Sequence, residues 1–207
     1  MASKLAAARK RGPKATAPGT LAAERARSGT AMLIIDMISC WDFEDAERLL
    51  PRAAAIAKPI ANLKARARRG GVPVIYANDN AGRWRSDFRS LVDESMAKGG
   101  QGRAVTELLM PDAEDFFVLK PKQSAFFGTP LELLLQHLGA HRLILTGVAS
   151  DQCVLVTVSE AVMRDLEAVV PRDCVASQTK QRNDLVLKQL ESFHKVPTSS
   201  STSLRFK

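Results

Sequence analysis

Residues 142–153 read Arg142-Leu-Ile-Leu-Thr-Gly-Val-Ala-Ser-Asp-Gln-Cys153. The first part is a short apolar run of the kind that is buried in a parallel sheet, and the glycine after it indicates a tight turn. Helical spacing follows from about residue 152 to residue 164. We therefore expect Cys153 where a strand ends and a helix begins, a place where unpaired backbone N–H groups favour the thiolate.

The same alternation of strand and helix extends along the chain in both directions, with no internal repeat. Apolar runs predict strands at 31–35, 72–77, 116–119, 142–146 and 167–170. Helical spacing predicts helices at 45–69, 130–138, 152–164 and 180–194. This order is typical of a doubly wound α/β domain, with helices on both faces of a mostly parallel sheet. The sequence thus predicts a three-layer α/β/α fold.

The two ends of the chain differ from this pattern. Residues 1–29 are rich in Ala, Lys, Arg, Gly and Pro, and the end contains Pro197 followed by a run of Ser and Thr. Such segments bury too little apolar surface to offset their ordering entropy. We expect disordered tails at 1–29 and 195–207 around one domain at 30–194. An Arg-rich, acid-poor start also resembles a transit peptide, and that alternative stays open.

Charge and cysteine content exclude several classes of protein. The net charge is +8, but the first 29 residues contribute +6 and the last 13 contribute +3, which leaves the body at −1. Nucleic-acid binding needs a basic folded surface, so we expect no nucleic-acid partner. No apolar run reaches the length of a membrane span. Three cysteines do not make a disulfide scaffold, which indicates a reducing, cytoplasmic compartment.

Reactive side chains follow the predicted strands. Asp36 follows the first strand, Asn78 the second, Lys120 the third and Cys153 the fourth. Ligands of open α/β sheets bind outside the carboxyl ends of the strands, so these side chains are expected to meet at one edge. There Asp36 accepts the thiol proton, Lys120 favours the thiolate, and backbone N–H groups near Ala149 and Cys153 bind an oxyanion. The set is suited to acyl transfer through a thioester.

Three segments make the chain similar to the isochorismatase-like cysteine hydrolase superfamily, which includes nicotinamidases and N-carbamoyl amidohydrolases. They are Leu33-Ile-Ile-Asp-Met37, Val118-Leu-Lys-Pro-Lys-Gln-Ser-Ala-Phe126 and Thr146-Gly-Val-Ala-Ser-Asp-Gln-Cys-Val154. The resemblance implies a Cys153 nucleophile, an Asp36 base and a Lys120 partner. It also implies a cis peptide between Val148 and Ala149 that helps to form the oxyanion hole, and a homo-oligomer, either a dimer or a tetramer.

The chain departs from the family pattern in two places. Family members often have Asp-Met-Gln-Asn-Asp-Phe after the first strand, whereas this chain has Asp36-Met-Ile-Ser-Cys-Trp41. Nicotinamidases hold a metal with histidines near the second strand, and no histidine lies near Asn78-Asp-Asn80. We therefore expect no metal and no cofactor. Family isochorismatases lack the cysteine, so Cys153 favours hydrolysis of a C–N bond in a small molecule.

Other side chains are assigned to substrate binding with a structural alternative beside each. Asn78, Arg83 and Trp84 are expected to overhang the pocket and orient a polar or anionic substrate, or else to form a hydrogen-bonded loop. Phe126 is expected to line the pocket or to pack in the core. Cys40 is a weaker candidate nucleophile than Cys153, since nothing places it at the start of a helix.

Other functions lack the residues they need. A phospho-acceptor domain needs further acids beside Asp36, and Ile35 and Met37 stand there. The chain lacks a Gly-rich dinucleotide motif after the first strand and a Gly-x-Ser-x-Gly elbow. A catalytically silent family member that acts as an oligomeric scaffold or binding protein remains open, because the loop after Asp36 is altered.

Overall fold

A computed structural model describes residues 29–80, 82–85 and 87–206. The predicted basic tail at 1–29 lies outside the described residues, apart from Gly29. None of the helices within the described ranges is long and apolar enough to cross a membrane.

The core of the domain is a five-stranded sheet in which every pairing is parallel, in the order β3-β2-β1-β4-β5. The strands are β1 (Thr30–Ile35), β2 (Val74–Asp79), β3 (Phe116–Lys120), β4 (Arg142–Gly147) and β5 (Glu167–Val169). Along the chain, β2 pairs with β1 and β3 pairs with β2. Strand β4 then pairs with the other side of β1. The α/β prediction is confirmed, and the strand order reverses between β1 and β4.

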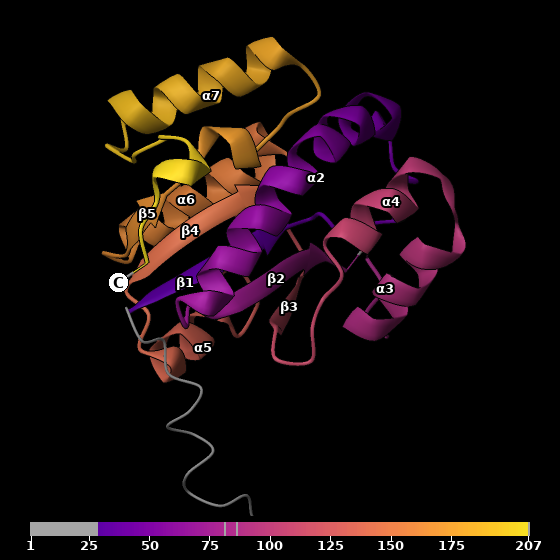
Figure 1. Cartoon of the computed structure of the whole chain (residues 1–207), viewed down its shortest axis with the longest axis horizontal. Helices are drawn as coiled ribbons and strands as arrows, with labels where there is room; N and C mark the ends of the chain where they lie inside the picture. The colour runs from indigo at the N-terminus through magenta and orange to yellow at the C-terminus, as the bar shows by residue number, and fades with distance from the viewer. Residues whose placement is uncertain (1–28, 81, 86, 207) are drawn as a thin grey trace, which may run out of the picture.

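Helices cover both faces of this sheet, as Figure 1 shows. The α-helices are α2 (Ala46–Arg69), α3 (Phe88–Ala97), α4 (Gly100–Leu108), α5 (Leu131–Leu138), α6 (Leu155–Met163) and α7 (Lys180–Ser192). Shorter turns are the π-helical η1 (Ser150–Val154) and the 3-10 turns η2 (Arg172–Cys174) and η3 (Ser201–Ser203). Helices α3 and α4 were not predicted from the sequence.

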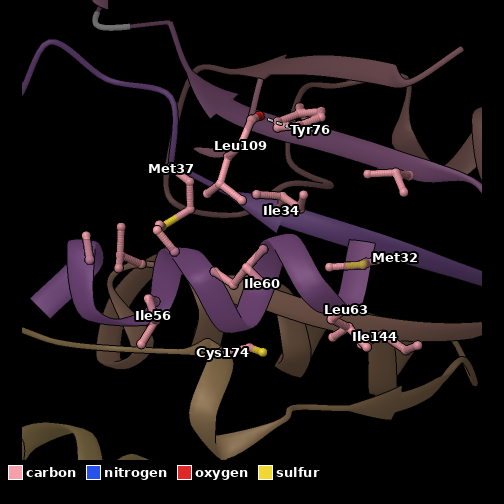
Figure 2. Close-up of a cluster of buried hydrophobic side chains, with 14 of the residues drawn as sticks. Met32, Ile34, Met37, Ile56, Ile60, Leu63, Tyr76, Leu109, Ile144 and Cys174 are labelled. Carbon is pink, nitrogen blue, oxygen red and sulfur yellow. Dashed lines mark hydrogen bonds between the residues drawn. The ribbon is translucent and has the colours of Figure 1, made fainter. Parts of the chain in front are cut away.

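Strand β1 is buried on both faces, and its side chains alternate between two apolar clusters. Met32 and Ile34 pack in the cluster beneath α2 and α4, whereas Leu33 and Ile35 pack in the cluster beneath α5, α6 and α7. Figure 2 shows Ile60 of α2 facing the first of these clusters. A period of two with apolar residues on both sides is what a central parallel strand requires. These two clusters form the interfaces between the three layers.

The last residues of the chain are ordered, so the prediction of a disordered tail at 195–207 is wrong for residues 195–206. Ser201 and Leu204 are buried against the domain. The Arg66 guanidinium donates to the carbonyl oxygens of both residues, and Asp173 accepts hydrogen bonds from the Ser201 N–H and hydroxyl. Partners distant in sequence therefore order a segment whose local composition favours disorder.

Gly147 is the last residue of β4 and pairs with Ile35 of β1. Its φ is +109°, and a Cβ there would lie 2.0 Å from the Ile35 carbonyl oxygen. The neighbouring atom is backbone of the central strand, so it cannot move aside without disturbing β1 and the adjacent Asp36.

We expect Gly147→Ala to lower the free energy of unfolding by roughly 3 kcal/mol or more, because it adds a backbone clash to an unfavourable φ. Gly139→Ala is the matched control, since Gly139 also has a positive φ but a Cβ added there would meet no atom within 4 Å. We expect that control to lose only about 1 kcal/mol. Urea unfolding of both variants gives the comparison, and equal losses would refute the close-approach explanation.

Candidate active site

Three of the predicted residues converge where the strands end. Asp36 follows β1, Lys120 is the last residue of β3, and Cys153 lies in η1 after β4. The Lys120 ammonium lies 2.9 Å from an Asp36 carboxylate oxygen and 3.4 Å from the Cys153 sulfur. The other Asp36 oxygen accepts the Asp79 N–H at 2.8 Å. The reversal of strand order between β1 and β4 brings the acid and the thiol to one edge.

Burial and mutual charge control the ionisation of this trio. Burial raises the pKa of the Asp36 carboxyl, against the opposing effect of Lys120 and of hydrogen bonds from Cys153, Lys120 and Asp79. Burial also raises the pKa of the Cys153 thiol to about 12, with the Asp36 carboxylate adding to the rise. Burial favours neutral Lys120, but Asp36 and Cys153 outweigh it, so the pKa of Lys120 is raised. The site therefore holds an ammonium and a protonated thiol beside a carboxyl that binds protons more readily than usual.

This ionisation state differs from the sequence expectation of a preformed thiolate. The start of a helix and a nearby lysine both favour the thiolate, but burial beside a carboxylate favours the thiol. The Cys153 proton must then be removed during the reaction, and Asp36 is the carboxyl positioned to take it.

Alkylation of Cys153 by iodoacetamide should follow this raised pKa. Only the thiolate reacts, so we expect the rate still to be rising between pH 8 and pH 10, past the ordinary thiol value of about 8.5. Peptide mapping of each labelled cysteine over this range measures the profile. A plateau of the Cys153 rate below pH 8 would show a stabilised thiolate and contradict the protonated thiol.

The turn between β4 and η1 presents one backbone donor. The peptide bond between Val148 and Ala149 is cis, as the resemblance implies. The Val148 N–H donates to the Ile35 carbonyl oxygen at 3.0 Å and is not available to an oxyanion. Within the part of the chain that the structure describes, the Ala149 N–H has no hydrogen-bond acceptor. Of Val148 and Ala149, whose cis peptide was expected to help form the oxyanion hole, Ala149 is therefore the residue whose N–H is available to bind an oxyanion.

These groups open onto a cavity of about 520 Å³, a size suited to a small-molecule ligand. Asp36, Cys153 and Ala149 line it, together with two predicted substrate-binding residues, Asn78 and Arg83. Lys120 is wholly buried beneath the cavity. The predicted acid, base-type cation and thiol therefore occupy one site.

Two predicted substrate contacts do not line this cavity. Trp84 is 83% exposed, because the turn after β2 is held by Asn80 and leaves the Trp84 ring in solvent. Phe126 is 5% exposed and belongs to the apolar cluster on the α5–α7 side of the sheet, where Arg164 stacks on its ring. For Phe126 the alternative of core packing is therefore correct.

A model of the isochorismatase domain matches residues 30–201. The chain belongs to the isochorismatase family. It is 36% identical over 166 residues to the uncharacterized isochorismatase family protein YaaI of Bacillus subtilis. The aligned residues cover 80% of this chain and 91% of that protein.

Other relatives of this isochorismatase-family chain have more specific names. It is 31% identical over 77% of its length to a protein of Arabidopsis thaliana named a probable inactive nicotinamidase, of which 86% is covered. It is 28% identical over 70% of its length to the ureidoacrylate amidohydrolase RutB of Yersinia enterocolitica, of which 74% is covered. An isochorismatase-like hydrolase structure from Alkaliphilus metalliredigens superposes with a TM-score of 0.67 at 24% identity, covering 84% and 95% of the two chains. That structure supports the fold.

Sequence reasoning missed part of the cavity wall in this isochorismatase-family chain. Besides the weaker candidate Cys40, the altered loop after Asp36 supplies Asp42, Glu44 and Asp45, and α3 supplies Glu94. The acidic run in the loop is visible in the sequence and is the signal that would have identified it. Glu94 had no such signal, because α3 was not predicted from the sequence.

Asp151, two residues before Cys153, contacts α7 and the segment before it. No side-chain hydrogen bond caps η1 among the described residues. Instead Asp151 accepts from the Ser177 hydroxyl and pairs with Arg182 at the start of α7. The contact ties the turn that carries Cys153 to the helix packed behind it.

Proposed function

We propose that this isochorismatase-family protein hydrolyses a C–N bond of a small amide or carbamoyl compound, with Cys153 as the nucleophile. The observation that carries the proposal is the single Lys120 ammonium in contact with both the Asp36 carboxylate and the Cys153 sulfur. The size of the cavity favours a small-molecule substrate. The amidohydrolase relative supports C–N chemistry.

The reaction begins with attack of the Cys153 sulfur on the substrate carbonyl carbon as the thiol proton passes to Asp36. The carbonyl oxygen becomes an oxyanion, which the Ala149 N–H binds. The C–N bond then breaks, and the leaving nitrogen takes the proton from Asp36. An acyl thioester remains on Cys153.

Water completes the cycle. Asp36 accepts a proton from the attacking water and passes it to the Cys153 sulfur as the C–S bond breaks and the acid product leaves. Lys120 keeps its proton throughout. Its charge offsets the negative charge that moves between the carboxylate and the sulfur.

The test is an ammonia-release assay of the wild-type protein on a panel of primary amides and carbamoyl compounds, with Asp36→Asn beside it. We expect turnover by the wild type and a loss of about 10²–10⁴-fold in the variant, the range for removal of a general base. No release by the wild-type protein would refute the proposal. Ligand binding without release would favour the silent binding protein, a possibility consistent with the name of the Arabidopsis relative.

A further inference from the structure

The wall of the catalytic cavity is strongly acidic in a protein that is basic as a whole. The complete chain has a net charge of +8. Of the described residues that line the cavity, six are acidic and one, Arg83, is basic. The acidic residues are Asp36, Asp42, Glu44, Asp45, Asp79 and Glu94.

Within the described part of the chain, several of these carboxylates share or lie near a cation. Arg83 pairs with Glu94 at 2.7 Å, Lys98 with Asp42 at 2.7 Å, and Arg48 lies 3.9 Å from Asp45. The Lys120 ammonium lies 2.9 Å from an Asp36 carboxylate oxygen and 3.6 Å from an Asp79 carboxylate oxygen. Among the residues that the structure describes, the four cations in these ion pairs are fewer than the six carboxylates. Glu44 has no ion-pair partner among the described residues.

The only lining cation that the structure describes is already engaged. The Arg83 guanidinium donates to Glu94, and this hydrogen bond raises its pKa. From its position in the sequence, Arg83 was expected to orient a polar or anionic substrate. An anionic substrate would compete with Glu94 for the guanidinium and approach the other carboxylates. A cleft lined mostly by one sign of charge focuses the field, so an anionic substrate would be repelled there.

A second feature of the wall independently favours a ligand that donates hydrogen bonds. Asn78 is 1% exposed, lines the cavity and donates its amide N–H to the Ile38 carbonyl oxygen at 2.7 Å. Its Oδ1 accepts no hydrogen bond from any residue that the structure describes. A buried acceptor left without a donor is costly, so a ligand N–H is the group that would complete it.

We propose that the substrate carries a positive charge, as an ammonium or guanidinium group, in addition to the amide or carbamoyl group that is cleaved. This inference rests on the proposed function and names the substrate class. The acidic wall attracts the cation and rejects carboxylate-bearing amides of the same size. A metal ion is a poorer occupant of the wall, because the described residues hold no group of three or more His, Cys, Asp or Glu arranged to bind one.

The first test needs no substrate. Two methanethiosulfonate reagents, one bearing a trimethylammonium and one a sulfonate, modify Cys153 when the sulfur attacks the reagent and expels methanesulfinate. Both reagents need the same thiolate, so the ratio of their rates reports the charge of the cavity alone. After normalisation to a free small thiol, we expect the cationic reagent to react at least about tenfold faster at Cys153.

Peptide mapping separates Cys153 from Cys40, which lines the same cavity. The rate ratio should fall toward that of the small thiol in 1 M salt, where the Debye length is about 3 Å. A ratio at or below that of the small thiol at low salt would overturn the proposal.

A matched pair of charge reversals locates the effect. Glu44→Lys changes a carboxylate that lines the cavity, and Glu47→Lys makes the same change three residues along, at an exposed residue outside the cavity wall. We expect the first to lower the rate ratio at least threefold and the second to leave it near the wild-type value. Equal effects would show that the ratio reports overall charge rather than the cavity.

The second test compares amides of similar size and different charge. These are β-alaninamide, butanamide and succinamate, which are cationic, neutral and anionic, and ammonia release is the readout. We expect kcat/KM to fall in that order by at least tenfold overall. Faster cleavage of butanamide or succinamate would overturn the charge inference while leaving C–N hydrolysis in place. A high reagent ratio with no cleavage of any amide would overturn the proposed function and leave a cavity selective for cations.

Discussion

Cys153→Ala should lower amide turnover by about 10⁴-fold or more, because no other group supplies the covalent intermediate. The side chain is small and only part-buried, so the fold should survive. We expect a change in the free energy of unfolding of no more than about 1 kcal/mol. Ammonia release and urea unfolding of the same preparation measure both quantities.

Cys40→Ala is the matched control for this experiment. Cys40 lines the same cavity, and its sulfur lies 4.0 Å from Glu94 rather than beside Lys120. Burial raises the pKa of the Cys40 thiol, as it does that of Cys153. The two thiols therefore differ in their neighbours rather than in the direction of their pKa shift. We expect the control to retain turnover within a few-fold of wild type. Loss in Cys40→Ala with retention in Cys153→Ala would reassign the nucleophile.

Lys120→Met should reduce both stability and activity. The ammonium is wholly buried and contacts Asp36, Asp79 and Cys153. Its removal leaves carboxylates without their counter-charge, and breaking a buried ion pair in this way costs about 3–5 kcal/mol. At pH 7 we expect kcat/KM to fall by roughly 10²–10⁴-fold, because Asp36 is then a poorly placed, more readily protonated base.

The loss of stability in Lys120→Met should depend on pH in a defined direction. Burial raises the pKa of Asp36 and Lys120 opposes that rise, so removing Lys120 raises the pKa further. A raised folded-state pKa favours folding below the unfolded value and loses this contribution as pH rises through the folded value. The penalty should therefore be small near pH 4 and grow toward pH 7. Urea unfolding across this range measures it.

Lys122→Met provides the control for Lys120→Met. Lys122 is exposed two residues further along, so the variant loses the same charge outside the site. We expect little change in stability at either pH. A penalty in Lys120→Met that is constant with pH would mean that lost packing, rather than the buried carboxylates, causes the destabilisation.

The sequence was sufficient to predict the sheet because its strands are short, continuous apolar runs. Ile35 and Gly147 pair at the ends of β1 and β4, and this pairing follows from the parallel order. Asp36 and Cys153 could therefore be assigned to one edge. The short helices α3 and α4 have no comparable apolar run, and Gly99, Gly100 and Gly102 interrupt the sequence where they meet.

Features set by distant contacts could not be predicted. The C-terminal Ser and Thr run has a composition typical of disorder, but Arg66 and Asp173 hold it. The exposure of Trp84 and the burial of Phe126 depend on how two loops turn. The raised pKa of Cys153 depends on burial beside Asp36, which no local pattern reports.

The central claim is that Cys153 carries an acyl group during C–N hydrolysis. Its most direct measurement is mass mapping of acid-quenched protein within the first turnover of the best amide, with hydroxylamine added in a parallel reaction. The account predicts an acyl adduct on the Cys153 peptide and diversion of product to the hydroxamate, because hydroxylamine attacks a thioester. Turnover with no adduct on Cys153 and no hydroxamate would show direct attack by water and contradict the account.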